Sequence, residues 1–168
     1  MLLPSIRVSL TRELRAFRRT IEAYPDDAGR WAAIPGVPNC GGTLALHVAG
    51  NIQHFVGALL GGSAYVRDRE AEFARRGLSR AELLRELDAA ADAVALTFAT
   101  LDEGATALPF PATIAGHQFR TSEVLVHLAV HLAFHLGQAD THRRAVTGLG
   151  QSVDPVSAKE MHELLIGT

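Results

Sequence analysis

Apolar residues recur at intervals of three and four along four long stretches of this chain, which is the spacing that puts side chains on one face of an α-helix. A helix with an apolar stripe must bury that stripe against another element, and no set of strand-like segments accompanies these stretches. The pattern therefore predicts an all-α protein, a four-helix bundle that forms a single domain over residues 1–168. The clearest stripe ends at Pro25 and consists of Leu3, Ile6, Leu10, Leu14, Phe17, Ile21 and Tyr24.

Capping and breaking residues set the ends of the other predicted helices. The second should begin near Thr43, a suitable N-cap, and stop at Gly61-Gly62. The third opens with a capping box formed by Ser79 and Glu82, and the fourth should span about Thr121 to Thr147. The expected stripe of the third helix is Leu84, Leu87, Ala91, Val94, Phe98 and Leu101.

Shorter elements are expected between and after these helices. A charged segment, residues 65–77, should form a short helix with a solvated face, whose charges are Arg67, Asp68, Arg69, Glu70, Glu72, Arg75 and Arg76. Residues 111–121 could form a small hairpin around Ala115-Gly116. A second capping box, Ser157 with Glu160, predicts a short extra C-terminal helix.

The composition narrows the class of protein. A hydrophobic share of 48% with only 20% charged residues indicates a globular chain, and the net charge of −2 gives no basic surface for nucleic acid. The single cysteine, Cys40, excludes an internal disulfide framework and fits a reducing compartment. No apolar run reaches the ~20 residues that a membrane span needs. We therefore expect a cytoplasmic protein that binds neither nucleic acid nor membranes.

The fourth stretch contains the sequence VHLAVHLAFHLGQADTH, in which His127, His131 and His135 stand four residues apart. Neutral imidazole is the commonest protein ligand for ions such as zinc and nickel. Two histidines that are four residues apart on a helix can converge on one ion. Ligands that are eight residues apart are separated by ~12 Å along the helix axis, which is too far for one ion. One neighbouring pair should therefore bind, together with a ligand from another helix.

A helical wheel selects the pair. The main apolar stripe of the fourth helix is Leu125, Leu128, Leu132, Leu136 and Ala139. His131 and His135 lie at the edge of this stripe and turn toward the bundle interior, whereas His127 falls further out, at the rim. The pair predicted to bind a metal is therefore His131 and His135.

The second helix offers the third ligand. Beside its apolar stripe runs a strip of small or polar residues that suits the wall of a cavity: His47, Gly50, Asn51, His54, Gly57 and Ala58. His47 borders both the stripe and the strip, while His54 is too far along to share the same ion. The predicted metal ligands are His47, His131 and His135, and Asn51, His54 and His142 are candidates for contacts to substrate or to the ligands.

These histidines and their surroundings resemble the DinB/YfiT-like superfamily of bacterial metal-binding proteins. The signature is a histidine on the second bundle helix and an HxxxH pair late in the fourth, here His47 with His131 and His135. Three segments match in order, HVAGNIQHF, RDREAEF and HLAFHLGQ, and a branch of unknown function has a similar HxAGN and RDxEF pattern. The resemblance covers roughly residues 5–150.

The resemblance implies a bundle in up-down-down-up order with a long second connection. It also implies a divalent metal ion, commonly nickel or zinc, bound by the three histidines, and frequent homodimers. Relatives in the superfamily include transferases and isomerases that use low-molecular-weight thiols such as bacillithiol or mycothiol.

Three neutral histidines leave coordination positions open for water or substrate. A metal there lowers the pKa of bound water toward ~7 or binds a thiol as thiolate. We therefore expect a metal-dependent enzyme that activates a thiol or water for transfer or hydrolysis on a small molecule. The alternatives are a non-catalytic metal- or ligand-binding bundle of the stress-response type, and histidines that only pack.

The opposite face of the fourth helix indicates whether the protein has a partner subunit. Val126, Val130 and Phe134 are apolar and lie away from the main stripe, so this helix is hydrophobic nearly all round. Such a helix is buried on both sides, either under the N-terminal loop or against a second subunit. We expect a homodimer.

Overall fold

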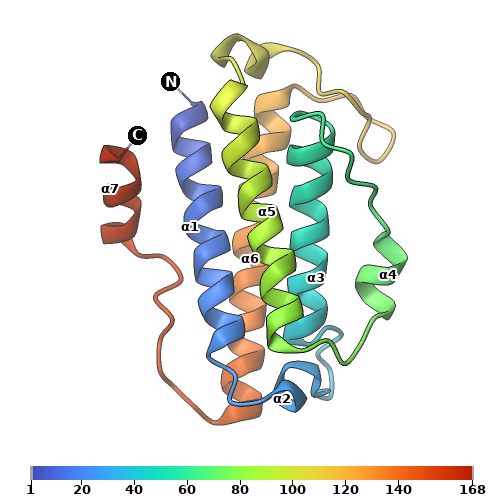
Figure 1. Ribbon diagram of the computed structural model, residues 1–168, viewed down its shortest axis with the longest axis vertical. Coiled ribbons are helices and arrows are strands. Elements are labelled where there is room, and N and C mark those ends of the chain that lie inside the picture. Colours follow the sequence, from blue (N-terminus) through green and yellow to red (C-terminus); the bar gives the residue numbers. More distant parts are fainter. Residues whose placement is uncertain (1, 168) are drawn as a thin grey trace.

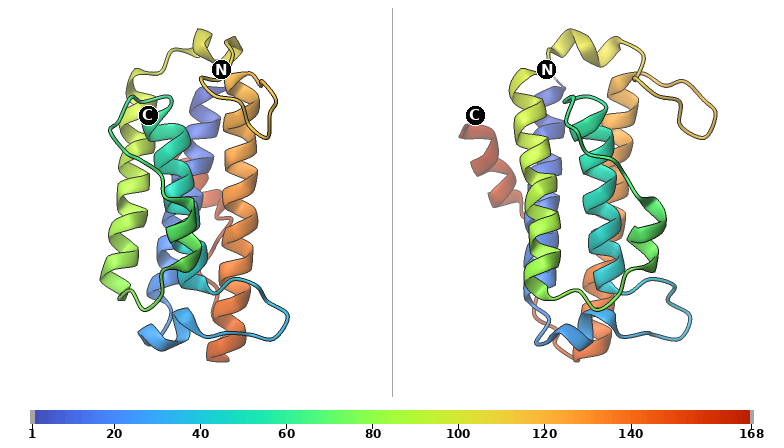
Figure 2. Two further views of the ribbon diagram at one scale, coloured as in Figure 1. Left: turned by 90° about the vertical axis from the view of Figure 1, so that its right-hand side faces the viewer. Right: turned by 45° about the vertical axis from the view of Figure 1, so that its right-hand side comes forward.

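Four long helices lie side by side in the computed structural model, which describes residues 2–167: α1 (Leu3–Glu22), α3 (Gly41–Ile52), α5 (Arg80–Thr100) and α6 (Thr121–Thr147). Helices α1 and α6 run in one direction and α3 and α5 in the other (Figures 1 and 2). Within residues 2–167 the extended segments form only isolated bridges. The protein is thus all-helical, in the predicted up-down-down-up order with a long second connection.

The apolar stripe of α1 forms one wall of the core. All seven of its predicted members are buried, and Leu10, Phe17, Ile21 and Tyr24 have no exposed surface. α1 packs against both α5 and α6, so this stripe lies at the centre of the bundle. The prediction for this helix is confirmed.

The buried face of α5 differs from the predicted stripe. Its buried residues are Leu83, Leu87, Ala90, Val94 and Thr97, whereas Leu84, Ala91, Phe98 and Leu101 are only partly buried. Because α5 packs against both α1 and α3, its buried face is wide, and Leu83, Ala90 and Thr97 are each buried one residue before an expected member of the stripe. The capping box of Ser79 and Glu82 is present as predicted.

Helix α3 begins three residues earlier than expected, because its N-cap is Cys40 and not Thr43. Cys40 precedes it, and Thr43 lies inside its first turn. The two glycines at the start allow close packing, since a Cβ on Gly42 would come within 2.7 Å of the Trp31 ring. At its other end α3 continues as a π-helical turn, η1 (Gln53–Ala58), and the chain leaves this path at Gly61-Gly62 as predicted.

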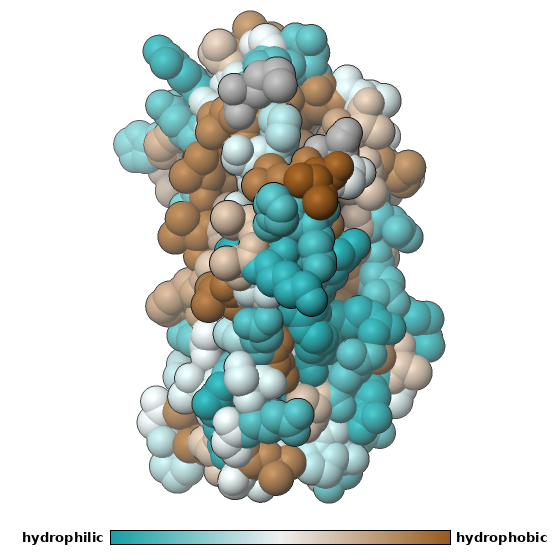
Figure 3. All heavy atoms as spheres, turned by 90° about the vertical axis from the view of Figure 1, so that its left-hand side faces the viewer, coloured by the Kyte–Doolittle hydropathy of each residue, from teal (hydrophilic) through white to brown (hydrophobic). Residues whose placement is uncertain are grey.

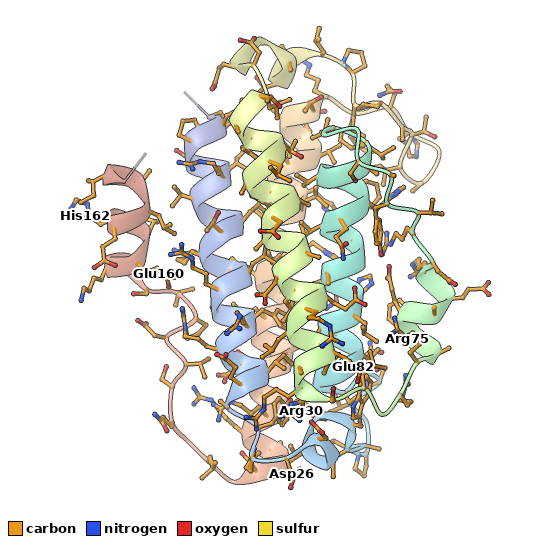
Figure 4. The ribbon with its side chains drawn as sticks, viewed as in Figure 1. Asp26, Arg30, Arg75, Glu82, Glu160 and His162 are labelled. Atoms are coloured by element: carbon orange, nitrogen blue, oxygen red, sulfur yellow. The ribbon has the colours of Figure 1, made fainter. Side chains whose placement is uncertain are left out.

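Short elements connect and flank the bundle. α2 (Asp27–Trp31) is capped by Asp26, and α4 (Arg69–Ala74) lies in the long connection between α3 and α5. Figure 4 shows Asp26 and Glu82 at the same end of the molecule, where α2 and α5 begin. The 3-10 turn η2 (Glu103–Ala107) follows α5 at the opposite end.

The predicted turn at Ala115-Gly116 is confirmed, although its flanks are too short to form strands. Ile114 and His117 exchange two backbone hydrogen bonds of 2.9 and 3.0 Å. Ala115 and Gly116 have φ values of 51° and 80°, as the tight turn of a hairpin requires.

The predicted C-terminal helix is also present, as α7 (Ala158–Ile166), and Ser157 caps it. α7 lies against α1, to which it is tied by an ion pair of 3.0 Å between Arg19 and Glu160. On this face of the molecule, hydrophilic residues gather over the middle (Figure 3). Among residues 2–167, no helix has both the length and the apolar character needed to cross a membrane.

Candidate metal centre

The structure brings His47 of α3 together with His131 and His135 of α6. One side-chain nitrogen of each lies within 4.8 Å of those of the other two. His131 Nε2 is 3.3 Å from His47 Nε2 and 3.1 Å from His135 Nε2. His47 is buried, and the two α6 residues are half-buried, so the cluster lies at the edge of the bundle with one side toward solvent.

The outer nitrogens of two of these rings have oxygen partners. His47 Nδ1 is 2.9 Å from Glu72 Oε2, and His135 Nδ1 is 2.7 Å from Gln138 Oε1. An ionised carboxylate and an amide oxygen only accept hydrogen bonds, so both imidazoles must donate from Nδ1. Arg67 Nη2 also approaches His47 Nδ1, but at 3.5 Å it does not compete with the carboxylate.

These hydrogen bonds leave nitrogen lone pairs without a donor at the centre of the cluster. A neutral imidazole that carries its proton on Nδ1 presents a lone pair at Nε2. His47 and His135 both direct such a lone pair at His131 Nε2, which can donate at most one proton. The arrangement therefore lacks at least one hydrogen-bond donor, and a single cation between the three nitrogens would satisfy all of their lone pairs.

The spacing of the nitrogens fits a metal ion. Bonds of about 2.0–2.1 Å in a tetrahedral centre place two nitrogens roughly 3.3 Å apart. The two Nε2 separations of 3.3 and 3.1 Å agree with this value. The three histidines selected from the sequence thus form a cluster that could hold a metal ion.

The surroundings favour neutral rings. Burial, and then the nearby rings of His135 and His47, lower the pKa of His131 from 6.5 to about 4. Burial also lowers the pKa of His135, although its hydrogen bond to Gln138 acts in the opposite direction. A histidine must be deprotonated to bind a metal, and His131 and His135 do not have to release a proton for this at neutral pH.

The candidate residue Asn51 lies near the cluster, and so does His127, which was expected at the rim. Asn51 lies one turn after His47 on the same face of α3; it is 7% exposed, and its Oδ1 has no hydrogen-bond partner among residues 2–167. His127 is exposed, and its ring centre is 6.0 Å from that of His131. Both positions are compatible with contacts to a bound small molecule.

The remaining candidates, His54 and His142, have other surroundings. His54 lies on the π-helical turn against Phe55, and burial followed by the charge of Arg67 lowers its pKa. The His142 ring is buried, accepts a 2.8 Å hydrogen bond from Tyr24 Oη, and donates one of 2.9 Å to the Ala32 carbonyl. Both nitrogens of His142 are thus used in holding α6 to the N-terminal segments.

The sequence prediction missed Glu72 and Arg67. Both were expected on a solvated face, but Glu72 is buried and its carboxylate accepts hydrogen bonds from His47 and from Arg67. Burial alone would raise the pKa of Glu72, but the hydrogen bonds from Arg67 and His47 lower it below its ordinary value. The expected open strip on α3 is consequently covered next to His47.

Two cavities open beside α6. The larger, about 580 Å³, lies between the Ile34–Asn39 loop and the part of α6 that includes Gln138. The smaller, about 190 Å³, is lined by Ile114, Phe119, Glu123, Val124 and His127. Its mainly apolar wall lies one helical turn from the cluster.

Comparison of the sequence with known protein families agrees with this geometry. The sequence profile of the DinB superfamily matches residues 9–139, about three quarters of the chain, and this span includes all three clustered histidines. No curated protein and no solved structure matches the chain. On the strength of the family match, this chain belongs to the DinB superfamily.

Proposed function

We propose that this protein is a metal-dependent enzyme in which His47, His131 and His135 bind one divalent ion, nickel or zinc. In this proposal the centre activates a thiol or a water molecule for transfer or hydrolysis on a small molecule. The observation that carries the proposal is the convergence of three Nε2 atoms, two of which have their Nδ1 protons donated to oxygen.

An ion bound there supplies Lewis acidity, which stabilises a thiolate or hydroxide at neutral pH. The protein supplies three imidazole nitrogens in a fixed orientation and leaves the solvent side of the cluster open. With three protein ligands the coordination sphere is incomplete, as is usual in catalytic rather than structural sites.

Residues beside the cluster support a small-molecule substrate. The unpaired Oδ1 of Asn51 can accept a hydrogen bond from a ligand, and His127 can donate or accept one. The 190 Å³ cavity next to His127 offers room for a small apolar group of such a ligand. These residues would orient the substrate relative to the metal.

An exogenous thiol fits this centre better than a thiol of the protein. Cys40 lies at the start of α3, where its Sγ is 3.2 Å from Thr43 Oγ1, and it is not a member of the cluster. A low-molecular-weight thiol is therefore the proposed co-substrate of a transferase reaction.

The test is metal analysis combined with turnover, on protein purified without a histidine tag. Wild-type protein should contain about one divalent ion per chain, and His131→Ala should remove it. His162→Ala is the matched control, because His162 lies on α7 away from the cluster (Figure 4). Turnover of thiol acceptors or activated esters supports the enzyme, while retained metal with no turnover in either panel favours the non-catalytic binding protein.

We also propose that the protein is a homodimer joined through α6. Val126, Val130 and Phe134 are 44%, 64% and 61% exposed, so the N-terminal loop does not cover them. Between Glu123 and Asp140 the helix has no charged Asp, Glu, Lys or Arg residue, over roughly 24 Å of its length. A second copy would bury this face, and light scattering at micromolar concentration should report a dimer.

A further inference from the structure

The long connection between α3 and α5 reaches the outer side of the His47 ring. Glu72, on α4, is 5% exposed and accepts a 2.9 Å hydrogen bond from His47 Nδ1. Arg67 donates to both oxygens of the same carboxylate, from Nε at 2.7 Å and from Nη2 at 2.8 Å. A buried carboxylate is thereby held between a guanidinium and an imidazole, all three of which are well shielded from solvent.

Two further contacts fix this arrangement. The Phe73 ring packs against the His47 ring with their centres 4.8 Å apart. Gly50, one turn after His47, leaves the space that Glu72 occupies, since a Cβ there would come within 2.9 Å of Glu72 Cδ and closer still to Oε1. The glycine on α3 and the carboxylate on α4 are therefore complementary in shape.

The chemistry of the three groups assigns their roles. The ionised carboxylate accepts the Nδ1 proton, so the lone pair of His47 must be on Nε2, which faces His131 and His135. Hydrogen bonds of this kind orient metal-binding histidines and raise their basicity. Arg67 balances the charge of Glu72 and occupies both of its oxygens, which keeps the carboxylate out of the coordination sphere.

We propose that Glu72, clamped by Arg67, is a positioning residue of the metal centre that fixes the tautomer and direction of His47 and couples metal binding to the order of the α3–α5 connection. This proposal rests on the proposed binding of a metal by the three histidines. It adds that a segment containing no ligand determines how tightly the ion is bound. A purely structural ion pair would stabilise the connection but leave metal affinity unchanged.

The experiment compares metal binding in four proteins prepared without a tag and stripped of metal. They are the wild type, Glu72→Gln, Gly50→Ala and the control Glu13→Gln. Glu13 is also a buried carboxylate paired with an arginine, Arg12, but it lies on α1 and has no contact with the cluster. Cobalt(II) is titrated into each protein and followed by its visible absorption spectrum.

Wild type and Glu13→Gln should bind cobalt equally and with the same spectrum. Glu72→Gln should bind about 10–100-fold more weakly, the usual effect of removing such a partner, and its spectrum should shift because His47 is no longer held in place. Gly50→Ala should weaken binding in the same direction, since its methyl group displaces the carboxylate while leaving every ligand intact.

Limited trypsin digestion gives a readout that does not depend on the affinity. The connection contains four arginines, Arg67, Arg69, Arg75 and Arg76, at which trypsin can cut. Metal should slow cleavage there in wild type and in Glu13→Gln, and should give less protection in Glu72→Gln even when that variant is saturated with cobalt. Circular dichroism of the metal-free proteins shows whether each variant is folded. If Glu72→Gln is unfolded, Gly50→Ala tests the role of Glu72 in its place.

The outcomes separate the two proposals. If wild type binds no cobalt, the proposed metal centre is wrong. If wild type binds cobalt and the folded Glu72→Gln and Gly50→Ala variants bind it with unchanged affinity and spectrum, the metal centre stands and the positioning role of Glu72 is refuted.

Discussion

The lowered pKa of His131 predicts that the stability of the metal-free protein depends on pH. In the unfolded chain His131 titrates near 6.5, whereas in the folded protein its pKa is about 4, chiefly because the ring is buried. As the pH falls from 6.5 to 4, the unfolded state takes up a proton that the folded state does not. The free energy of unfolding should therefore be greatest above pH 6.5 and should decrease as the pH falls from 6.5 to 4.

The size of the effect follows from the two pKa values. One pKa unit corresponds to about 1.36 kcal/mol, so the fall from 6.5 to about 4 sets an upper limit of roughly 3.4 kcal/mol. His131 is only half-buried, and solvent screening reduces this limit. We expect a loss of about 1–2 kcal/mol from this residue.

The assay is urea unfolding of EDTA-treated protein at pH 7.0 and at pH 4.5, for wild type and His131→Gln. The variant lacks the titrating ring, so between the two pH values it should lose about 1–2 kcal/mol less free energy of unfolding than wild type. His162→Gln, which removes an exposed histidine of α7, should behave as wild type. Equal losses in wild type and His131→Gln would refute the reasoning.

Two further predictions concern residues outside the cluster. His142→Phe should lower the free energy of unfolding by about 1–3 kcal/mol, because the buried Tyr24 hydroxyl and Ala32 carbonyl lose a partner, and it should leave the metal content unchanged. A loss of metal in this variant would show that His142 contributes to the centre. Val130→Lys places a charge in the middle of the exposed apolar face of α6 and should shift the protein to monomers in sedimentation velocity, while a wild type that is already monomeric would contradict the proposed dimer.

Much of the fold could be predicted from the sequence because its signals are local. The stripe of α1, the Ser79 cap of α5 and the Ala115-Gly116 turn each depend on residues close in sequence. The α5 stripe was misplaced in part, since Leu84, Ala91 and Phe98 were each expected one residue after a buried position. Its position depends on two neighbouring helices, and the pattern within α5 alone does not contain this information.

The cluster could be predicted because helical geometry restricts it. Spacings of four and eight residues on α6 excluded a three-ligand set from one helix, and the small-residue strip on α3 indicated His47 as the partner. Glu72 could not be found in this way, since its position depends on the path of the α3–α5 connection. The available signal was Gly50, a glycine inside a helix one turn from a candidate ligand, which indicates close approach by another group.

X-ray absorption at the metal edge tests the central claim most directly, on untagged protein loaded with one equivalent of zinc or nickel. We expect three imidazole nitrogens at about 2.0–2.1 Å in wild type and two in His47→Ala. An imidazole count that does not change when His47 is removed would contradict a centre shared between α3 and α6.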